Sequence, residues 1–246
     1  MKTDLALYTG SRACPNLNAV RTAIQTTRQS AREFVQLDLT ADLPDNFVEM
    51  FNRAVLYLVW HQFFAIATRG IRLPYIPISD VCEISGVATL TDKDSGAGYK
   101  TRLVWMPPAL LHHMRHTEPL IDSVRQHLQL DWDQELSPIF FLDEERRATE
   151  IRPKLIEDLS RDFFPFPSNT PRRVMRRLLR NSGLSSERIE VYLGHWLERR
   201  EPWGKWSSFD YGDYLDNLRL HIPKILADLN FECPKKERKS DPASER

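Results

Sequence analysis

Arginine is concentrated in one short segment of this sequence, and arginine is the residue best suited to binding phosphate. Between Asn169 and Gly183 the chain is NTPRRVMRRLLRNSG. A guanidinium group presents a planar fork of donors that can bind two phosphate oxygens at once, whereas an ammonium group acts as a point charge. No acid within the segment stands at the helical spacing that would pair with these charges. The segment therefore indicates contact with phosphate or nucleic acid, and the plainer alternative is a solvated basic helix face.

Three further segments carry basic residues at places where a fold could bring them together. Leu193-Gly-His195 ends the stretch that follows the arginine segment. Upstream, Gly70-Ile-Arg72 follows a long apolar run of helical spacing. Between these two, Lys93 precedes a turn-forming DSGAG sequence, and Lys100 and Arg102 follow it. Each of these short sequences is common by itself, so only their order along the chain indicates a function.

In this order, the four segments resemble the tyrosine recombinases of the phage integrase family. That family has a helix ending in Gly-x-Arg, a β-hairpin with a lysine at the turn, and an arginine at the start of a later helix. A glycine follows about eleven residues on, and the next helix ends in Leu-Gly-His. Arg172, Gly183 and His195 are similar to the last three features. The resemblance extends over about residues 47–231.

The resemblance implies that the protein breaks and rejoins double-stranded DNA through a 3′-phosphotyrosine intermediate. Arg72 and Arg172 would bind the non-bridging oxygens of the phosphate, and Lys93 would protonate the leaving 5′ oxygen. His195 would hydrogen-bond the phosphate or take the proton of the tyrosine. Because guanidinium groups supply the positive charge, we expect no metal and no cofactor. Further DNA or phosphate contacts are expected from Asn169, Arg173, Arg176, Arg177, Lys100 and Arg102.

The nucleophile implied by the resemblance is Tyr214, with Tyr211 as the second candidate. Both follow His195 and lie one helical turn apart. A tyrosine hydroxyl is a weak nucleophile at its reference pKa of about 10, so it needs concentrated positive charge nearby. Tyr214 is expected in the first ordered turn of the last helix, where the positive end of the helix dipole favours the phenolate. The plainer alternative is a half-buried tyrosine that packs this helix on the core.

The sequence departs from the family pattern at several positions. Asn169 stands where the family commonly has His or Lys, Arg173 where it has His, and Tyr75 where it has an acid. The segment between His195 and the tyrosine is also long. Asn169 can donate a hydrogen bond but no proton, which favours one alternative: a catalytically inactive or truncated DNA-binding remnant. A soluble helical interaction protein is the other alternative, and it leaves the order of the segments unexplained.

The elements that position these residues are expected to be mostly helical. Two runs, 87–91 and 99–106, predict a β-hairpin in which Lys100 and Arg102 share one face. Pro119 is expected to separate two short helices, and 137–142 to be irregular. The sequence predicts an α+β class, predominantly helical with one small antiparallel hairpin, and the resemblance implies the recombinase catalytic-domain fold. Apolar spacing and capping signals predict helices over about 16–36, 47–67, 150–161, 170–183, 185–195 and 211–229. The last three are expected to be capped by Thr170, by Ser185, and by Ser208 or Asp210, and Gly183 is expected to end the helix that begins near residue 170.

Composition sets the remaining expectations. The 246 residues include 34 basic and 34 acidic side chains, a balance that excludes a non-specific polycation but not a local basic patch. Three widely spaced cysteines indicate neither a disulfide framework nor a zinc site. We expect an N-terminal helical arm or remnant over 1–45 and a disordered charged tail over 233–246, and the resemblance implies a tyrosine recombinase catalytic domain over 46–232. With no secretion signal and no apolar span, we expect a cytoplasmic protein. The resemblance also implies that it self-associates on DNA as a tetrameric synapse.

Overall fold

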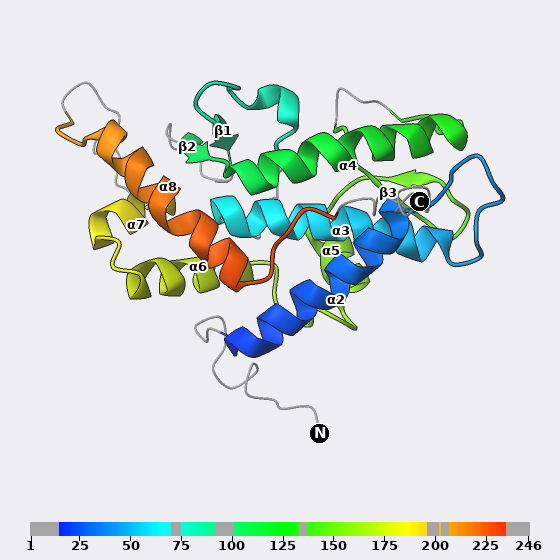
Figure 1. Cartoon of the computed structure of the whole chain (residues 1–246), viewed down its shortest axis with the longest axis horizontal. Coiled ribbons are helices and arrows are strands. Elements are labelled where there is room, and N and C mark those ends of the chain that lie inside the picture. Colours follow the sequence, from blue (N-terminus) through cyan, green and yellow to red (C-terminus); the bar gives the residue numbers. More distant parts are fainter. Residues whose placement is uncertain are drawn as a thin grey trace, which may run out of the picture.

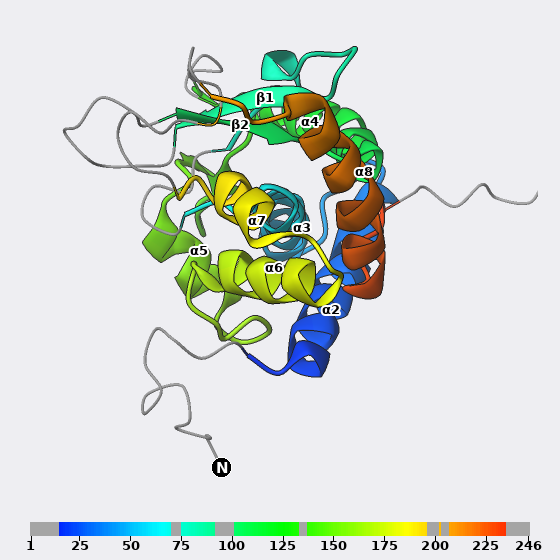
Figure 2. The same ribbon diagram turned by 90° about the vertical axis from the view of Figure 1, so that its left-hand side faces the viewer.

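A long apolar helix forms the centre of the protein. The computed structural model describes residues 15–69, 75–91, 101–132, 137–195, 202 and 207–234. In these ranges the central helix is α3 (Phe47–Ile66). Other helices lie around it (Figures 1 and 2). They are α2 (Leu17–Val35), α4 (Pro108–His127), α5 (Pro153–Ser160), α6 (Thr170–Asn181), α7 (Ser186–Tyr192) and α8 (Tyr211–Asp228).

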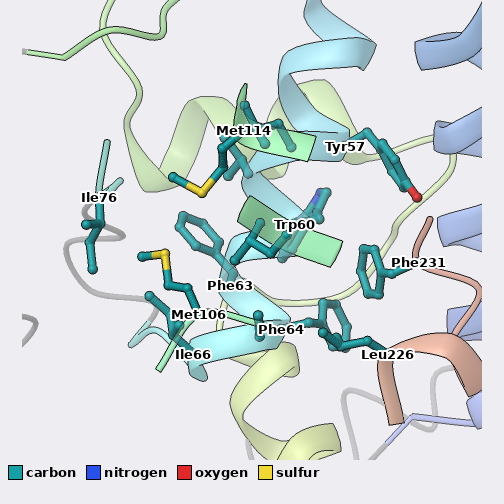
Figure 3. Packing of buried hydrophobic residues seen from close by; sticks show 14 of the residues in the cluster. Tyr57, Trp60, Phe63, Phe64, Ile66, Ile76, Met106, Met114, Leu226 and Phe231 are labelled. Atoms are coloured by element: carbon teal, nitrogen blue, oxygen red, sulfur yellow. The ribbon is translucent and has the colours of Figure 1, made fainter. Parts of the chain in front are cut away.

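The sequence of α3 explains its central position. Every side chain from Ala54 to Ile66 is buried. A helix that is apolar on all sides is stable only when other elements cover its whole circumference. Figure 3 shows its aromatic residues Tyr57, Trp60 and Phe64 among side chains contributed by other elements. The core is therefore built outward from this one helix.

The strands are short and lie at the periphery. β1 (Val87–Thr91) pairs antiparallel with β2 (Thr101–Trp105), which confirms the predicted hairpin. A second pair, β3 (Phe141–Leu142) with β4 (Ala148–Thr149), was not predicted, because 137–142 was expected to be irregular. Among the described residues the protein is thus mostly helical with two small antiparallel sheets, consistent with the α+β class.

One predicted helix boundary is wrong. Pro119 was expected to separate two short helices, but it lies inside the single helix α4. A proline inside a helix removes one backbone hydrogen bond. Buried residues on both sides of it, such as Met114 and Ile121, pack into the same core. This tertiary packing offsets the missing bond and keeps the helix continuous.

The segment after α8 contacts both α3 and α2. The ring of Phe231 stacks on that of His61, with centroids 4.8 Å apart. The Tyr57 hydroxyl donates to the Glu232 carbonyl at 2.6 Å and accepts from the Glu232 N–H at 2.9 Å. The Glu232 carboxylate also pairs with Arg28 of α2 at 2.9 Å. Residues of helix α2 therefore belong to the same hydrophobic core as the other described helices.

Two buried histidines face each other between α3 and α4. The Nδ1 atoms of His61 and His113 are 3.0 Å apart, and neither side chain is exposed to solvent. One Nδ1 must donate to the other, so at least one ring accepts through an unprotonated nitrogen. Burial lowers the pKa of His61 to about 3, and burial also lowers the pKa of His113 well below its usual range. Both rings are therefore neutral in the folded protein.

This pair should make the protein sensitive to acid. A histidine in the unfolded chain has a pKa of about 6.5, so unfolding takes up a proton below that pH. The contribution of the neutral histidine pair to the free energy of unfolding is complete above pH 6.5 and is lost as the pH falls toward 3. From His61 alone we expect the free energy of unfolding to decrease by about 2 kcal/mol between pH 7 and pH 5. Urea unfolding at the two pH values measures this.

The matched controls are His61→Gln, which removes the buried imidazole, and His116→Gln, which removes an exposed one from α4. The first should lose the part of the pH dependence that comes from His61 and keep the part that comes from His113, and the second should keep both parts. Equal stability of the wild-type protein at pH 7 and pH 5 would contradict a neutral buried pair.

Candidate functional site

Local capping explains how α6 and α7 come to lie next to each other. Gly183 ends α6 with φ of +90°, a left-handed conformation that glycine adopts without steric cost. The Ser185 hydroxyl then accepts a hydrogen bond from the Arg188 N–H and begins α7, as predicted. After α7, Gly194 is also left-handed, and the His195 N–H donates to the Glu190 carbonyl at 2.8 Å. These turns place His195 beside the first turn of α6.

Arg172 connects three segments that are far apart in sequence. Its guanidinium donates to the Ala67 carbonyl at the end of α3 at 3.1 Å and to the Leu193 carbonyl after α7. It also lies 2.7 Å from Nε2 of His195. The predicted convergence of Arg172 and His195 is therefore present. Figure 2 shows the ends of α3, α6 and α7 meeting in this region.

Arg102 does not have the DNA-contacting role expected from sequence. It is only 2% exposed, and β2 directs it into the protein with Val104 rather than to the surface. Its guanidinium donates to the carbonyls of Tyr192 at 2.6 Å, Ile66 at 2.9 Å and Ala67 at 3.0 Å. A buried arginine needs partners for its donors, and here carbonyls at two helix ends accept hydrogen bonds from both terminal nitrogens of the guanidinium. Arg102 therefore connects β2 to the ends of α3 and α7 by hydrogen bonds inside the protein.

A third arginine at this place was not predicted. Arg69 donates to the Gly194 carbonyl at 3.3 Å. Arg69 directly precedes Gly70 in the segment that contains Arg72, and this position is the only feature of the sequence that indicates its place in the group. We call the group of Arg69, Arg102, Arg172 and His195 the arginine junction. It gathers positive charge at the carbonyl ends of α3 and α7, where the helix dipoles are negative.

A carboxylate adjoins the arginine junction on the side of α7. Oε2 of Glu190 is 2.6 Å from Nδ1 of His195, and Oε1 of Glu190 is 2.5 Å from the Arg176 guanidinium. Arg176, expected to contact DNA, thus has a protein partner. Partial burial, followed by the charge of Arg172, lowers the pKa of His195, while Glu190 raises it. The balance favours the neutral imidazole near neutral pH.

Three other arginines of α6 remain available for external contacts. In the described part of the chain, Arg173, Arg177 and Arg180 have no carboxylate within ion-pair distance. Val174, Met175 and Leu179 hold the opposite side of the helix in the core. Asn169 directly precedes α6 and is partly buried, and its Oδ1 has no hydrogen-bond partner among the described residues. Thr170, expected to cap this helix, lies inside its first turn instead.

Tyr214 is buried close to the arginine junction. It is 1% exposed, and its hydroxyl has no hydrogen-bond partner within the described ranges. Burial raises its pKa well above the usual value, and the nearby charge of Arg102 opposes this rise. Tyr211, one turn earlier, is more exposed, and burial raises its pKa as well. Asp210 caps α8 by accepting from the Asp213 N–H at 3.0 Å, as predicted.

The other expected site residues, Arg72, Lys93 and Lys100, lie outside the described residues, as does most of the tail. In the described ranges no cluster of three or more His, Cys, Asp or Glu residues could hold a metal ion. Within the same ranges, no helix combines the length and apolarity that a membrane crossing requires. No protein-family model, no curated protein and no solved structure matches the chain.

Proposed function

We propose that this protein is a tyrosine-type DNA strand transferase, in which Arg172 and His195 of the arginine junction bind the scissile phosphate and Tyr214 attacks it. The observation that carries the proposal is the convergence of Arg172 and His195, 2.7 Å apart, with Tyr214 near Arg102. These residues come from separate segments of the chain. The proximity of Arg172 to His195, and of Tyr214 to Arg102 in the same junction, supports the proposal independently of the order of the segments.

The proposed reaction needs only groups of this chain and the DNA. The Tyr214 oxygen attacks phosphorus, and the bond from phosphorus to the 5′ oxygen breaks. His195 takes the tyrosine proton, and Lys93 gives a proton to the departing 5′ oxygen. Arg172 and Arg72 stabilise the charge that develops on the non-bridging oxygens. A 5′-hydroxyl then attacks the phosphotyrosine, which reverses these transfers and restores the enzyme.

The buried hydroxyl of Tyr214 adds one requirement. A nucleophile must reach the phosphorus, and a side chain that is 1% exposed must first move outward. Because the hydroxyl has no partner among the described residues, no hydrogen bond has to be broken when it leaves. We propose that DNA binding draws Tyr214 out by placing a phosphate against the arginine junction.

The experiment is a covalent trap. The full chain is incubated with a pool of DNA duplexes of randomised sequence, each carrying a nick so that the fragment released by cleavage diffuses away. Re-ligation is then prevented, and a protein–DNA adduct accumulates that survives denaturing electrophoresis. An adduct that nuclease digestion reduces to phosphotyrosine supports the proposal, and its absence across the pool contradicts it.

The second candidate function is a DNA-binding remnant without catalysis. Two observations favour it: burial raises the pKa of Tyr214, and Arg172 already donates to the Ala67 and Leu193 carbonyls. On this hypothesis the arginines bind phosphate, but no tyrosine is presented. DNA binding with no adduct in the trap would identify this function.

Both candidate functions predict that DNA binding depends strongly on salt. Arg173, Arg177 and Arg180 are the α6 arginines without a carboxylate partner in the described chain. If each neutralises one phosphate, the slope of log K against log salt is about −3. Fluorescence anisotropy with a labelled duplex at several salt concentrations measures this slope. Arg177→Gln should reduce its size by about one.

The control for that measurement is Arg188→Gln, since Arg188 is already paired with Asp213 and should leave the slope unchanged. A slope near zero in the wild-type protein would contradict both DNA-binding functions. It would favour a helical protein-interaction module instead.

A further inference from the structure

The arrangement around His195 fixes which of its two nitrogens carries a proton. Arg172 can only donate hydrogen bonds, because a guanidinium has no acceptor. Nε2 of His195, 2.7 Å from the Arg172 guanidinium, must therefore be the unprotonated acceptor. The proton of the neutral ring then lies on Nδ1, which donates to Oε2 of Glu190 at 2.6 Å. The two neighbours together specify one tautomer.

The carboxylate that receives this proton is itself held in place. Its other oxygen pairs with Arg176 at 2.5 Å, so Glu190 bridges α6 and the end of α7. The Glu190 side chain is 33% exposed and that of His195 is 36% exposed, so both sit at the surface where a ligand can approach. Arg176, Glu190, His195 and Arg172 form a continuous chain of contacts across this surface.

We propose that Glu190 is the positioning residue that orients His195 and holds it in the Nδ1–H tautomer, so that Nε2 is free to accept the proton of the nucleophile. This inference rests on the proposed function for its catalytic meaning. When a phosphate oxygen draws the Arg172 guanidinium toward itself, the Nε2 lone pair becomes available to the tyrosine hydroxyl. The proton moves from that hydroxyl to Nε2, and the resulting imidazolium is stabilised by the adjacent carboxylate.

The charged groups around His195 determine the direction of each expected effect. They are Arg172 on α6 and Arg69 after α3, which lower its pKa, and Glu190 on α7, which raises it. Glu190→Gln removes only the negative charge and keeps the shape. The pKa of His195 should therefore fall, and the ring becomes a weaker base. Glu187→Gln removes an exposed carboxylate from the first turn of the same helix and serves as the matched control.

The first measurement requires no DNA. Nitrogen NMR of the full chain, labelled at histidine and assigned with a His195→Gln variant, reports the protonation of each ring nitrogen. Above the His195 pKa we expect a protonated Nδ1 and an unprotonated Nε2. The titration midpoint should move to lower pH in Glu190→Gln, stay in place in Glu187→Gln, and return part of the way in Glu190→Asp. A protonated Nε2, or an unchanged midpoint in Glu190→Gln, would overturn the inference.

The second measurement uses the nicked DNA pool. Adduct formation by Glu190→Gln should be about tenfold to a hundredfold slower than in the wild type, with its rising pH limb displaced to lower pH. A normal rate and limb in this variant, while the wild type forms adduct, would overturn the positioning role and leave the proposed function standing. The remaining outcome is that the wild type forms no adduct while the NMR titration midpoint of His195 still shifts in Glu190→Gln. That result would overturn the proposed function and support the orientation of His195 by Glu190.

Discussion

Replacing Tyr214 with phenylalanine should abolish the covalent protein–DNA adduct while leaving DNA binding within about twofold of the wild type. Phenylalanine lacks the oxygen that forms the bond to phosphorus, so the loss is complete rather than graded. The fold should tolerate the change, because the Tyr214 hydroxyl is buried and has no partner among the described residues. Removing an unsatisfied buried hydroxyl is neutral or slightly stabilising. Denaturing electrophoresis of the trapped adduct and urea unfolding measure the two effects.

Tyr211→Phe is the matched control, since this residue lies one turn earlier on α8 and its hydroxyl also has no partner in the described chain. It should form adduct at a normal rate. If Tyr211→Phe loses the adduct and Tyr214→Phe keeps it, the nucleophile has been assigned to the wrong turn. If both variants form adduct, catalysis through either tyrosine is wrong.

Arg172→Lys should slow adduct formation about a hundredfold to a thousandfold, whereas DNA binding should weaken by less than about tenfold. Lysine keeps the positive charge but loses the planar fork. In this structure the fork is also what lets one side chain reach the Ala67 carbonyl, the Leu193 carbonyl and His195 together. An ammonium group in its place would leave the alignment of His195 with the phosphate less defined.

Single-turnover trapping and fluorescence anisotropy on the same protein preparation separate the two effects. Arg152→Lys is the matched control: it makes the same change at an arginine that pairs with Glu150 outside the junction, and both the rate of trapping and the DNA affinity should stay near the wild type. Equal losses of binding and of adduct formation in Arg172→Lys would mean that Arg172 is a DNA anchor with no special part in the reaction. Urea unfolding of Arg172→Lys checks that the junction remains folded.

The parts of the fold that depend on neighbouring residues were predictable. The Ser185 and Asp210 caps and the left-handed Gly183 act over a few residues, and each begins or ends its helix as expected. Helix α3 was also predictable, because a long apolar run has few alternatives to burial. These local signals set the bounds of the helices next to Arg172 and His195, whereas the convergence of the two side chains was expected only from the family resemblance.

The contacts that the sequence did not indicate are made with partners distant in the sequence. Strand alternation puts Arg102 and Val104 on one face, but it does not say that this face is the buried one. The burial of Arg102 becomes favourable only when the ends of α3 and α7 supply carbonyls, and nothing near β2 indicates them. In the same way, no acid inside α6 neutralises Arg176, since its partner Glu190 lies on the next helix.

The anchoring of α8 limits how the protein can change shape. At its far end Phe231 and Glu232 are fixed to α3 and α2, and in its first turn Asp213 pairs with Arg188 of α7. A helix fastened at both ends does not swing outward as a rigid lever. On the proposed function, Tyr214 would therefore move outward by fraying of the first turn, where Gly212 lowers the helical propensity. Such an opening would be a local melting event, and strengthening the Arg188–Asp213 pair should slow it.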